Sequence, residues 1–168
     1  MAISMYSASV PVFRRQLAAV GKVFEKAAAH AAARKMDEGV LLQTRLFPDM
    51  LPLVRQVQIA ADFAKNTSAL LAGVEPPKFE DSEANFADVQ ARVARTLAHL
   101  ATFKPEQIDG GDAREITRQI GGSPMTFTGE IYLLHFAMPN FYFHCTTAYA
   151  ILRHCGVEIG KRDFIGGL

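Results

Sequence analysis

The sequence predicts an all-α fold, a bundle of four long helices with a short β-hairpin inserted before the last helix. Two patterns predict it. In three segments apolar residues recur at spacings of three and four, which places them on one face of a helix, and a fourth segment is a long uncharged run rich in aromatic residues. Before the last of these segments, residues 109–128 switch to an alternation of apolar and polar residues around a Gly-Gly pair, which is typical of a hairpin.

Length and composition suit one folded domain that covers residues 1–168. The chain of 168 residues is 49% hydrophobic and 21% charged, the balance of an ordinary globular protein. Its formal net charge of +1 gives no electrostatic reason to expect nucleic acid or a membrane surface as a partner. Cys145 and Cys155 lie about 15 Å apart along one helix, too far for a disulfide, so two reduced thiols and a cytoplasmic location are predicted.

The first helix is predicted from Ser4, a candidate N-cap, to about Lys35. Pro11 then requires either a separate first turn or a bend in the helix, because proline cannot donate a helical hydrogen bond. Gly39 breaks the helical pattern after it. The connection that follows is expected to pack on the core through three leucines, Leu41, Leu42 and Leu46.

The second helix is predicted from about Met50 to Ala72, with Asp49 as its N-cap and Gly73 as its stop. Two glutamines near its apolar stripe allow two interpretations. The amide of Gln56 could point into the interior, or Gln56 and Gln58 could both be residues at the boundary with solvent. Composition alone favours the boundary interpretation.

The third helix is predicted to open at Ser82 and to end before Pro105. A double proline precedes it and cannot continue a helix. Its apolar positions are spaced for burial. Four of its polar side chains are expected to face solvent: Gln90, Arg92, Arg95 and His99.

The last helix, Gly129–Cys155, carries no Asp, Glu, Lys or Arg between Ile131 and Leu152. Such a run is either a membrane span or a buried helix. Pro139, Asn140 and two histidines inside it, with no strong basic flank, favour a buried helix of a bundle. Pro139 is expected to kink it. The glycine-rich tail after it is not expected to be helical, but Phe164 suggests that the tail docks.

Asn140 and His144 are four residues apart and therefore share one face of the last helix. This is the spacing by which a helix offers two ligands to one metal ion, but a neutral amide oxygen is a poor ligand for zinc or nickel. Three interpretations of His144 stay open: a buried histidine that Gln56 or a tyrosine hydroxyl satisfies, a residue of a small-molecule pocket, or a metal ligand.

Three segments together carry a family resemblance. They are SMYSASVPVFRRQL near the N-terminus, RLFPDMLPLVRQVQIAADFAK at Arg45–Lys65, and TFTGEIYLLHFAMPNFYFHCTTAYAILRHCGVEIGKRDFIG at Thr126–Gly166. They resemble a bacterial domain family of unknown function within the DinB/YfiT-like superfamily of metal-dependent enzymes. The resemblance covers nearly the whole chain. It implies a four-helix bundle of up-down-down-up topology and a homodimer.

Metal-binding members of that superfamily use three histidines, one from the second helix and an H-x3-H pair on the last. His144 matches the last of these, but Asn140 stands four residues earlier and Gln56 is the nearest polar residue on the second helix. The resemblance therefore implies a degenerate metal site. His144 is the one candidate metal ligand that remains, and a nickel or zinc cofactor is disfavoured.

The function that follows from these residues is small-molecule binding in a pocket of Gln56, Asn140 and His144. The resemblance also implies an alternative, a metal-dependent enzyme of the transferase or hydrolase type. A further alternative is a structural or interaction homodimer. Catalytic residues cannot be assigned from the sequence.

Overall fold

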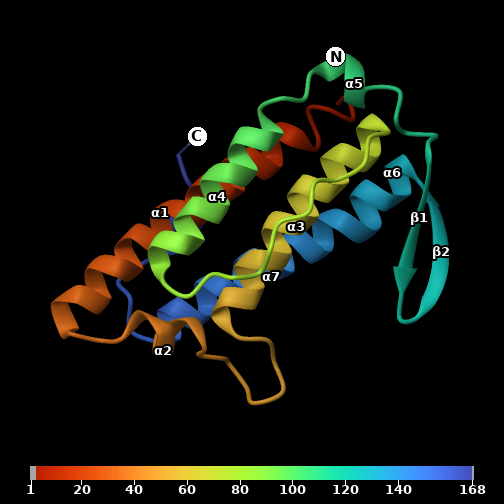
Figure 1. Ribbon diagram of the computed structural model, residues 1–168. Helices are drawn as coiled ribbons and strands as arrows, with labels where there is room; N and C mark the ends of the chain where they lie inside the picture. The colour runs from red at the N-terminus through yellow and green to blue at the C-terminus, as the bar shows by residue number, and fades with distance from the viewer. Residues whose placement is uncertain (1–2, 168) are drawn as a thin grey trace.

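The computed structural model describes residues 3–167, and four long helices that pack together dominate it (Figure 1). They are α1 (Val10–Arg34), α3 (Leu53–Ala72), α4 (Phe86–Leu100) and α7 (Met138–His154). Helix α3 packs against both α7 and α4, and α1 packs against α4, α7 and α3. The predicted all-α class with one hairpin is confirmed.

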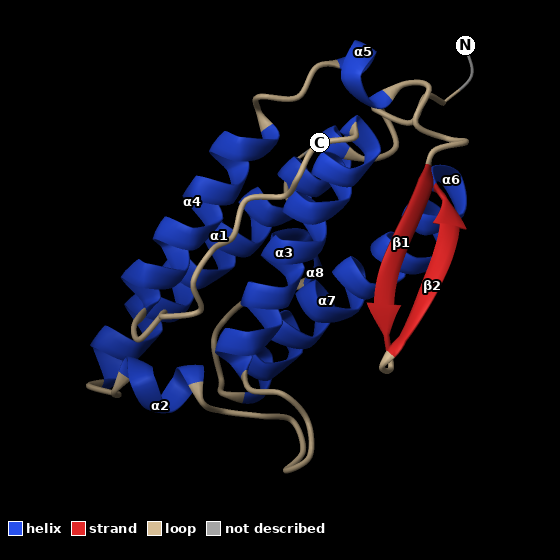
Figure 2. Ribbon diagram, turned by 45° about the vertical axis from the view of Figure 1, so that its right-hand side comes forward, coloured by secondary structure: helices blue, strands red, loops and turns tan. Residues whose placement is uncertain are grey.

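The hairpin stands beside the helices at one end of the molecule (Figure 2). Strands β1 (Glu115–Ile120) and β2 (Ser123–Thr128) pair antiparallel, and Gly121 and Gly122 form the turn with φ angles of +59° and +87°. Two consecutive residues at positive φ make the turn whose twist suits a two-residue hairpin. The remaining short elements are α2 (Glu38–Leu42), α5 (Pro105–Ile108), α6 (Gly129–Ile131), the π-helical segment η1 (Tyr132–Ala137) and α8 (Lys161–Ile165).

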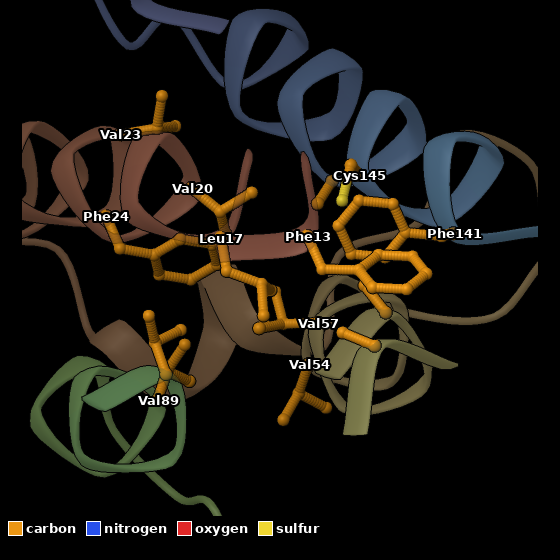
Figure 3. Close-up of a cluster of buried hydrophobic side chains, with 14 of the residues drawn as sticks. Phe13, Leu17, Val20, Val23, Phe24, Val54, Val57, Val89, Phe141 and Cys145 are labelled. Atoms are coloured by element: carbon orange, nitrogen blue, oxygen red, sulfur yellow. The ribbon is translucent and has the colours of Figure 1, made fainter. Parts of the chain in front are cut away.

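Aromatic and branched side chains from all four long helices meet in the core (Figure 3). Phe13 of α1 and Phe141 of α7 are fully buried and pack edge to face, with ring centroids 4.9 Å apart. Phe24 of α1 and Phe86 of α4 form a second such pair at 5.6 Å. Helix α1 is therefore held to α7 at one place and to α4 at another.

Helix α1 begins at Val10 and not near Ser4, and of the two alternatives that Pro11 required, the separate first turn is the one that the structure has. The residues before it form a separate turn, closed by a hydrogen bond from the Ala8 amide to the Ser4 carbonyl. Pro11 consequently lies in the first turn of α1, where its missing N–H removes no helical hydrogen bond. The helix ends near the predicted residue, with Lys35 in the left-handed conformation.

Helix α3 begins at Leu53, and the predicted N-cap at Asp49 is wrong. The reason is Pro52, which disfavours a helical backbone at the residue before it. Gly73 ends the helix at φ +72°, as predicted. In the preceding connection the burial expected of three leucines holds for two, Leu41 and Leu42, while Leu46 is 39% exposed.

Helix α4 is capped by Asn85, whose side chain accepts a hydrogen bond from the Asp88 amide at 2.9 Å, so the predicted opening at Ser82 is wrong. Three of the four polar residues that were expected to face solvent do not: Gln90 is partly buried, and its Nε2 donates to the Gly21 carbonyl of α1 at 2.6 Å. Arg92 is 1% exposed and His99 is half-buried. The connection between α3 and α4 covers this side of the helix and supplies groups that bind the Arg92 guanidinium.

The predicted last helix is divided in three, and its irregularity lies before Pro139. The π-helical segment η1 widens the turn between α6 and α7, and Pro139 then falls in the first turn of α7. Such single π-turns accommodate an interruption of the helical hydrogen-bond ladder. Within residues 3–167 no helix is both long enough and apolar enough to cross a membrane.

The C-terminal tail contains a short helix, α8, which the glycine-rich sequence did not predict. Its first turn is closed by the side chain of Asp163, which accepts a hydrogen bond from the Gly160 amide at 2.8 Å. The tail docks as expected. Phe164 packs on Tyr149 at 5.6 Å, and the Phe164 carbonyl accepts a hydrogen bond from Gln16 of α1.

Candidate functional site

The structure brings two of the three predicted pocket residues together. Gln56 of α3 and His144 of α7 are 1% and 9% exposed, and the Gln56 Oε1 lies 2.7 Å from the His144 Nδ1. This is the hydrogen bond that the buried-histidine interpretation names. Gln58 is buried as well, so the interpretation of both glutamines as boundary residues is wrong. Each lies on a face of α3 that another element covers.

The backbone determines which nitrogen of His144 carries the proton. The Gln56 Nε2 donates to the Leu51 carbonyl at 2.9 Å, which orients the amide so that its oxygen faces the imidazole. An amide oxygen only accepts, so Nδ1 must be the protonated nitrogen. Burial lowers the pKa of His144 below its ordinary value, and the ring is neutral at neutral pH. Nε2 therefore carries a free lone pair.

Two aromatic rings flank this imidazole. Phe63 of α3 stacks on it with ring centroids 6.2 Å apart, and Phe143 of α7 packs edge to face at 5.2 Å. Nε2 has no hydrogen-bond partner among residues 3–167. Solvent reaches it, since it is not among the buried polar atoms that lack a partner there. The arrangement therefore offers one hydrogen-bond acceptor, of set orientation, next to apolar surface.

Asn140 does not join the pair, although it lies one turn before His144. Its Nδ2 donates to the Phe136 carbonyl at 2.7 Å. That carbonyl belongs to η1, where the helical ladder is interrupted. The amide of Asn140 therefore satisfies the backbone beside the π-helical segment rather than facing Gln56.

The side chains around His144 do not form the ligand set of the zinc or nickel ion that the family resemblance implies. His144 offers a single donor atom, Nε2, because its Nδ1–H is donated to Gln56, and the amide of Asn140 is engaged elsewhere. A structural or catalytic zinc site needs three or four ligands. In the described part of the chain no three His, Cys, Asp or Glu side chains cluster as a metal ion would require.

A cleft of about 260 Å³ opens next to this site, between α3, strand β1 and η1. Its walls are Ile59, Asp62, Phe63, Asn66, Arg118, Gln119, Ile120, Tyr132 and Phe136. None of the three predicted pocket residues lines it, but Phe63 belongs both to the cleft and to the surroundings of His144. Sequence reasoning missed this cleft because the hairpin, which forms one wall, was not placed against any helix.

A second group of residues was also missed, a cluster of charges between α3 and α4. Its centre is Arg92, whose guanidinium lies 3.0 Å from carboxylate oxygens of both Asp81 and Glu83 and 3.3 Å from Asp62. The acidic run 80–83 after the double proline was the available signal. It predicts nothing by itself, because acidic loops are usually solvated.

Fold and site together define a class: a bundle of long helices with a hairpin before the last one, and a single buried histidine between α3 and α7. The sequence profile of DUF1993, a domain of unknown function, matches residues 5–165, so the chain belongs to this family.

The crystal structure of a DinB family member protein from Shewanella denitrificans is similar over most of its length. It is 39% identical, the match covers 97% of this chain and 92% of that chain, and the TM-score is 0.90. The expected DinB-like fold is thereby confirmed. No curated protein matches the chain.

Proposed function

We propose that this DinB-like protein binds a small molecule beside His144, at a metal site that has lost its ligand set. The observation that carries the proposal is the chain of two hydrogen bonds from the Leu51 carbonyl through Gln56 to Nδ1. It holds the imidazole in one tautomer and leaves Nε2 without a partner. Solvent reaches this acceptor, since it is not among the buried unpartnered atoms, and the protein fixes its direction, so a ligand donor that displaces the solvent finds an oriented lone pair.

The surroundings restrict the chemistry of that ligand. It must donate a hydrogen bond to Nε2, because the neutral ring offers only a lone pair there. It also meets aromatic surface, since the Phe143 side chain is 56% exposed. A small molecule with one N–H or O–H donor and an apolar body meets both conditions.

The experiment is a fragment screen read by thermal shift and by the ¹⁵N resonances of the His144 ring. The expected result is a set of donor-bearing fragments that shift the Nε2 resonance and that lose binding in His144→Phe. The matched control is His154→Phe, which changes an exposed histidine at the end of the same helix. A ring that shows the Nε2–H tautomer, or fragments that bind the His144→Phe protein equally well, would overturn the proposal.

The alternative function is catalysis, with His144 as a general base. The same neutral Nε2 supports it, because a base must be unprotonated near the operating pH. The form of this alternative that depends on a metal is a transferase or hydrolase. Metal analysis of protein made without a polyhistidine tag tests it, and a content well below one equivalent would remove it.

A homodimer is the further alternative, and exposed apolar residues support it. Phe143 on α7 and two residues of the α2–α3 connection, Phe47 and Leu51, are 56%, 64% and 43% exposed. A mass measurement in solution at micromolar concentration tests it, and a monomer would remove it. A cytoplasmic location stays a prediction, supported by the two free thiols of Cys145 and Cys155.

The finer topology is part of the same proposal. We infer an up-down-down-up order for α1, α3, α4 and α7. The course of the colour along these helices in Figure 1 supports it, as does the packing of α3 against both α4 and α7.

A further inference from the structure

The cleft between α3 and the hairpin has an apolar floor. Phe63 and Phe136 pack against each other with centroids 5.8 Å apart, and Tyr132 packs on Phe136 at 5.6 Å. Phe63 and Phe136 are only partly buried, so part of each ring stays uncovered. Ile59 and Ile120 face the same space from α3 and β1. A flat apolar group could therefore lie against these rings.

Arg118 interrupts the apolar side of β1. Side chains two apart in a strand share a face, and the residues on this face are Ile116, Arg118 and Ile120, of which Ile116 is 3% exposed. An arginine between two isoleucines on the inward face is unexpected for a strand that merely packs on a helix. Its guanidinium makes no ion pair or hydrogen bond to any group within residues 3–167, and it lines the cleft.

Asn66 also lines the cleft, and its side-chain amide has an N–H group without a partner. The Asn66 Oδ1 accepts a hydrogen bond from the buried Lys65 Nζ at 2.7 Å. This contact orients the amide, so its NH₂ group is the part left to other partners, and none lies in the described chain. The groups without partners in the cleft thus include N–H donors from Asn66 and Arg118, beside the Tyr132 hydroxyl and the exposed Gln119 amide.

Asp62 carries the one negative charge in the lining of this cleft, and its charge is already compensated. The Asp62 Oδ1 lies 3.3 Å from the Arg92 guanidinium and 3.5 Å from the Lys65 Nζ. Arg118 is consequently the cleft charge that lacks a counter-ion. A guanidinium fork presents two parallel N–H groups that match a carboxylate.

We propose that this cleft binds a small aromatic carboxylate, with the ring on Phe63 and Phe136 and the carboxylate on Arg118 and Asn66. A volume of about 260 Å³ admits a ligand of roughly a dozen non-hydrogen atoms, at the small end of ligand pockets. The site goes beyond the proposed function, since neither Gln56 nor His144 lines it. A ligand beside His144 must be a donor, whereas a ligand in this cleft is an acceptor.

The test compares two probes of one shape, 2-naphthoate and its neutral amide, 2-naphthamide, by calorimetric titration of the full chain. The expected result is binding of the naphthoate at least about tenfold tighter than that of the amide, because only the anion forms charge-assisted hydrogen bonds. Chemical-shift changes should fall on Phe63, Phe136 and the β1 amides. Equal affinity for the two probes would overturn the proposal.

Three variants locate the effect. Arg118→Gln should lower the affinity for naphthoate to that for the amide. Asn66→Asp should also weaken naphthoate binding, because it places a carboxylate oxygen where the donor stood and leaves the acceptor for Lys65 intact. Arg34→Gln, at an exposed position at the end of α1, makes the same change in net charge and should leave the affinity unaltered. Naphthoate binding that persists in folded Arg118→Gln and Asn66→Asp, or shifts confined to His144, would contradict the assignment.

Discussion

Helix α3 contacts its two main neighbours through opposite kinds of polar interaction. Toward α4 it contributes Asp62 and Lys65 to a cluster of charges around the buried Arg92. Toward α7 it contributes the neutral amide of Gln56, which bonds the neutral ring of His144. The first interface is therefore ionic, whereas the second contains one neutral hydrogen bond among aromatic rings.

The two interfaces differ in which polar atoms they leave without a hydrogen-bond partner. In the ionic interface three carboxylates and the Glu80 carbonyl engage Arg92, and the connection between α3 and α4 is held down as a result. At the α7 interface the Nε2 of His144 has no partner in the described chain. The ionic interface thus leaves only the buried Arg92 Nε unpartnered among the guanidinium nitrogens, whereas the His144 Nε2 is an oriented acceptor that solvent, and therefore a ligand, can reach.

The largest effect is expected from Arg92→Ala. Removing the buried guanidinium leaves Glu83, whose side chain is 6% exposed, without its cation, and we expect the free energy of unfolding to fall by about 3 kcal/mol. Urea titration measures it. The control is Arg14→Ala at an exposed position of α1, which should change stability by less than about 0.5 kcal/mol. A loss for Arg92→Ala no larger than for the control would contradict an ionic interface that stabilises the fold.

A smaller effect is expected from Gln56→Leu at the neutral interface. The Nδ1–H of His144 would lose its acceptor while buried, and we expect a loss of about 2 kcal/mol. The double variant Gln56→Leu with His144→Phe removes both polar partners and should recover about 1 kcal/mol of the summed single losses. Strictly additive losses in this double-mutant cycle would show that the two side chains are not coupled.

His144 is a titratable group of the interface between α3 and α7, so it makes the stability of the fold depend on pH. Burial lowers the pKa of His144 in the folded state below its ordinary value of 6.5. The unfolded chain then binds the proton more readily, so stability is lost as the pH falls below about 6.5. Denaturant midpoints between pH 7.5 and 5 measure the loss, which His144→Phe should reduce. A residual dependence is expected from His99, whose pKa burial and then the Lys65 charge lower.

The smallest effect is expected at the edge of the ionic cluster. Arg55 pairs with Asp81, but their side chains are 40% and 38% exposed. Exposed pairs contribute about 0–1 kcal/mol and are screened by salt. Arg55→Gln should therefore lower stability by less than about 1 kcal/mol, and the loss should shrink further at 1 M salt. A loss as large as that of Arg92→Ala would mean that the whole cluster acts as one unit.

Much of the fold could be predicted from the sequence because it depends on local patterns. Apolar spacing located the long helices, Gly73 marked the end of α3, and Gly121 and Gly122 marked the hairpin turn. The errors were at helix starts, where Pro52 and Asn85 decided the boundary through local backbone geometry. The division of the last helix by η1 was also out of reach, because a π-turn has no periodic signature.

The candidate site, like the fold, has some features that the sequence determines and others that depend on how the elements pack. The sequence by itself determined that His144 lacks a second histidine four residues before it, and that Gln56 is the nearest polar residue on the second helix. Tertiary structure alone decided that these two side chains meet, that Arg92 turns inward, and that Arg118 faces α3 across a cleft. The physical reason is that a sequence shows which residues share a face of one element. Which element covers that face, and whether a polar group there gains a partner, depends on how the elements pack.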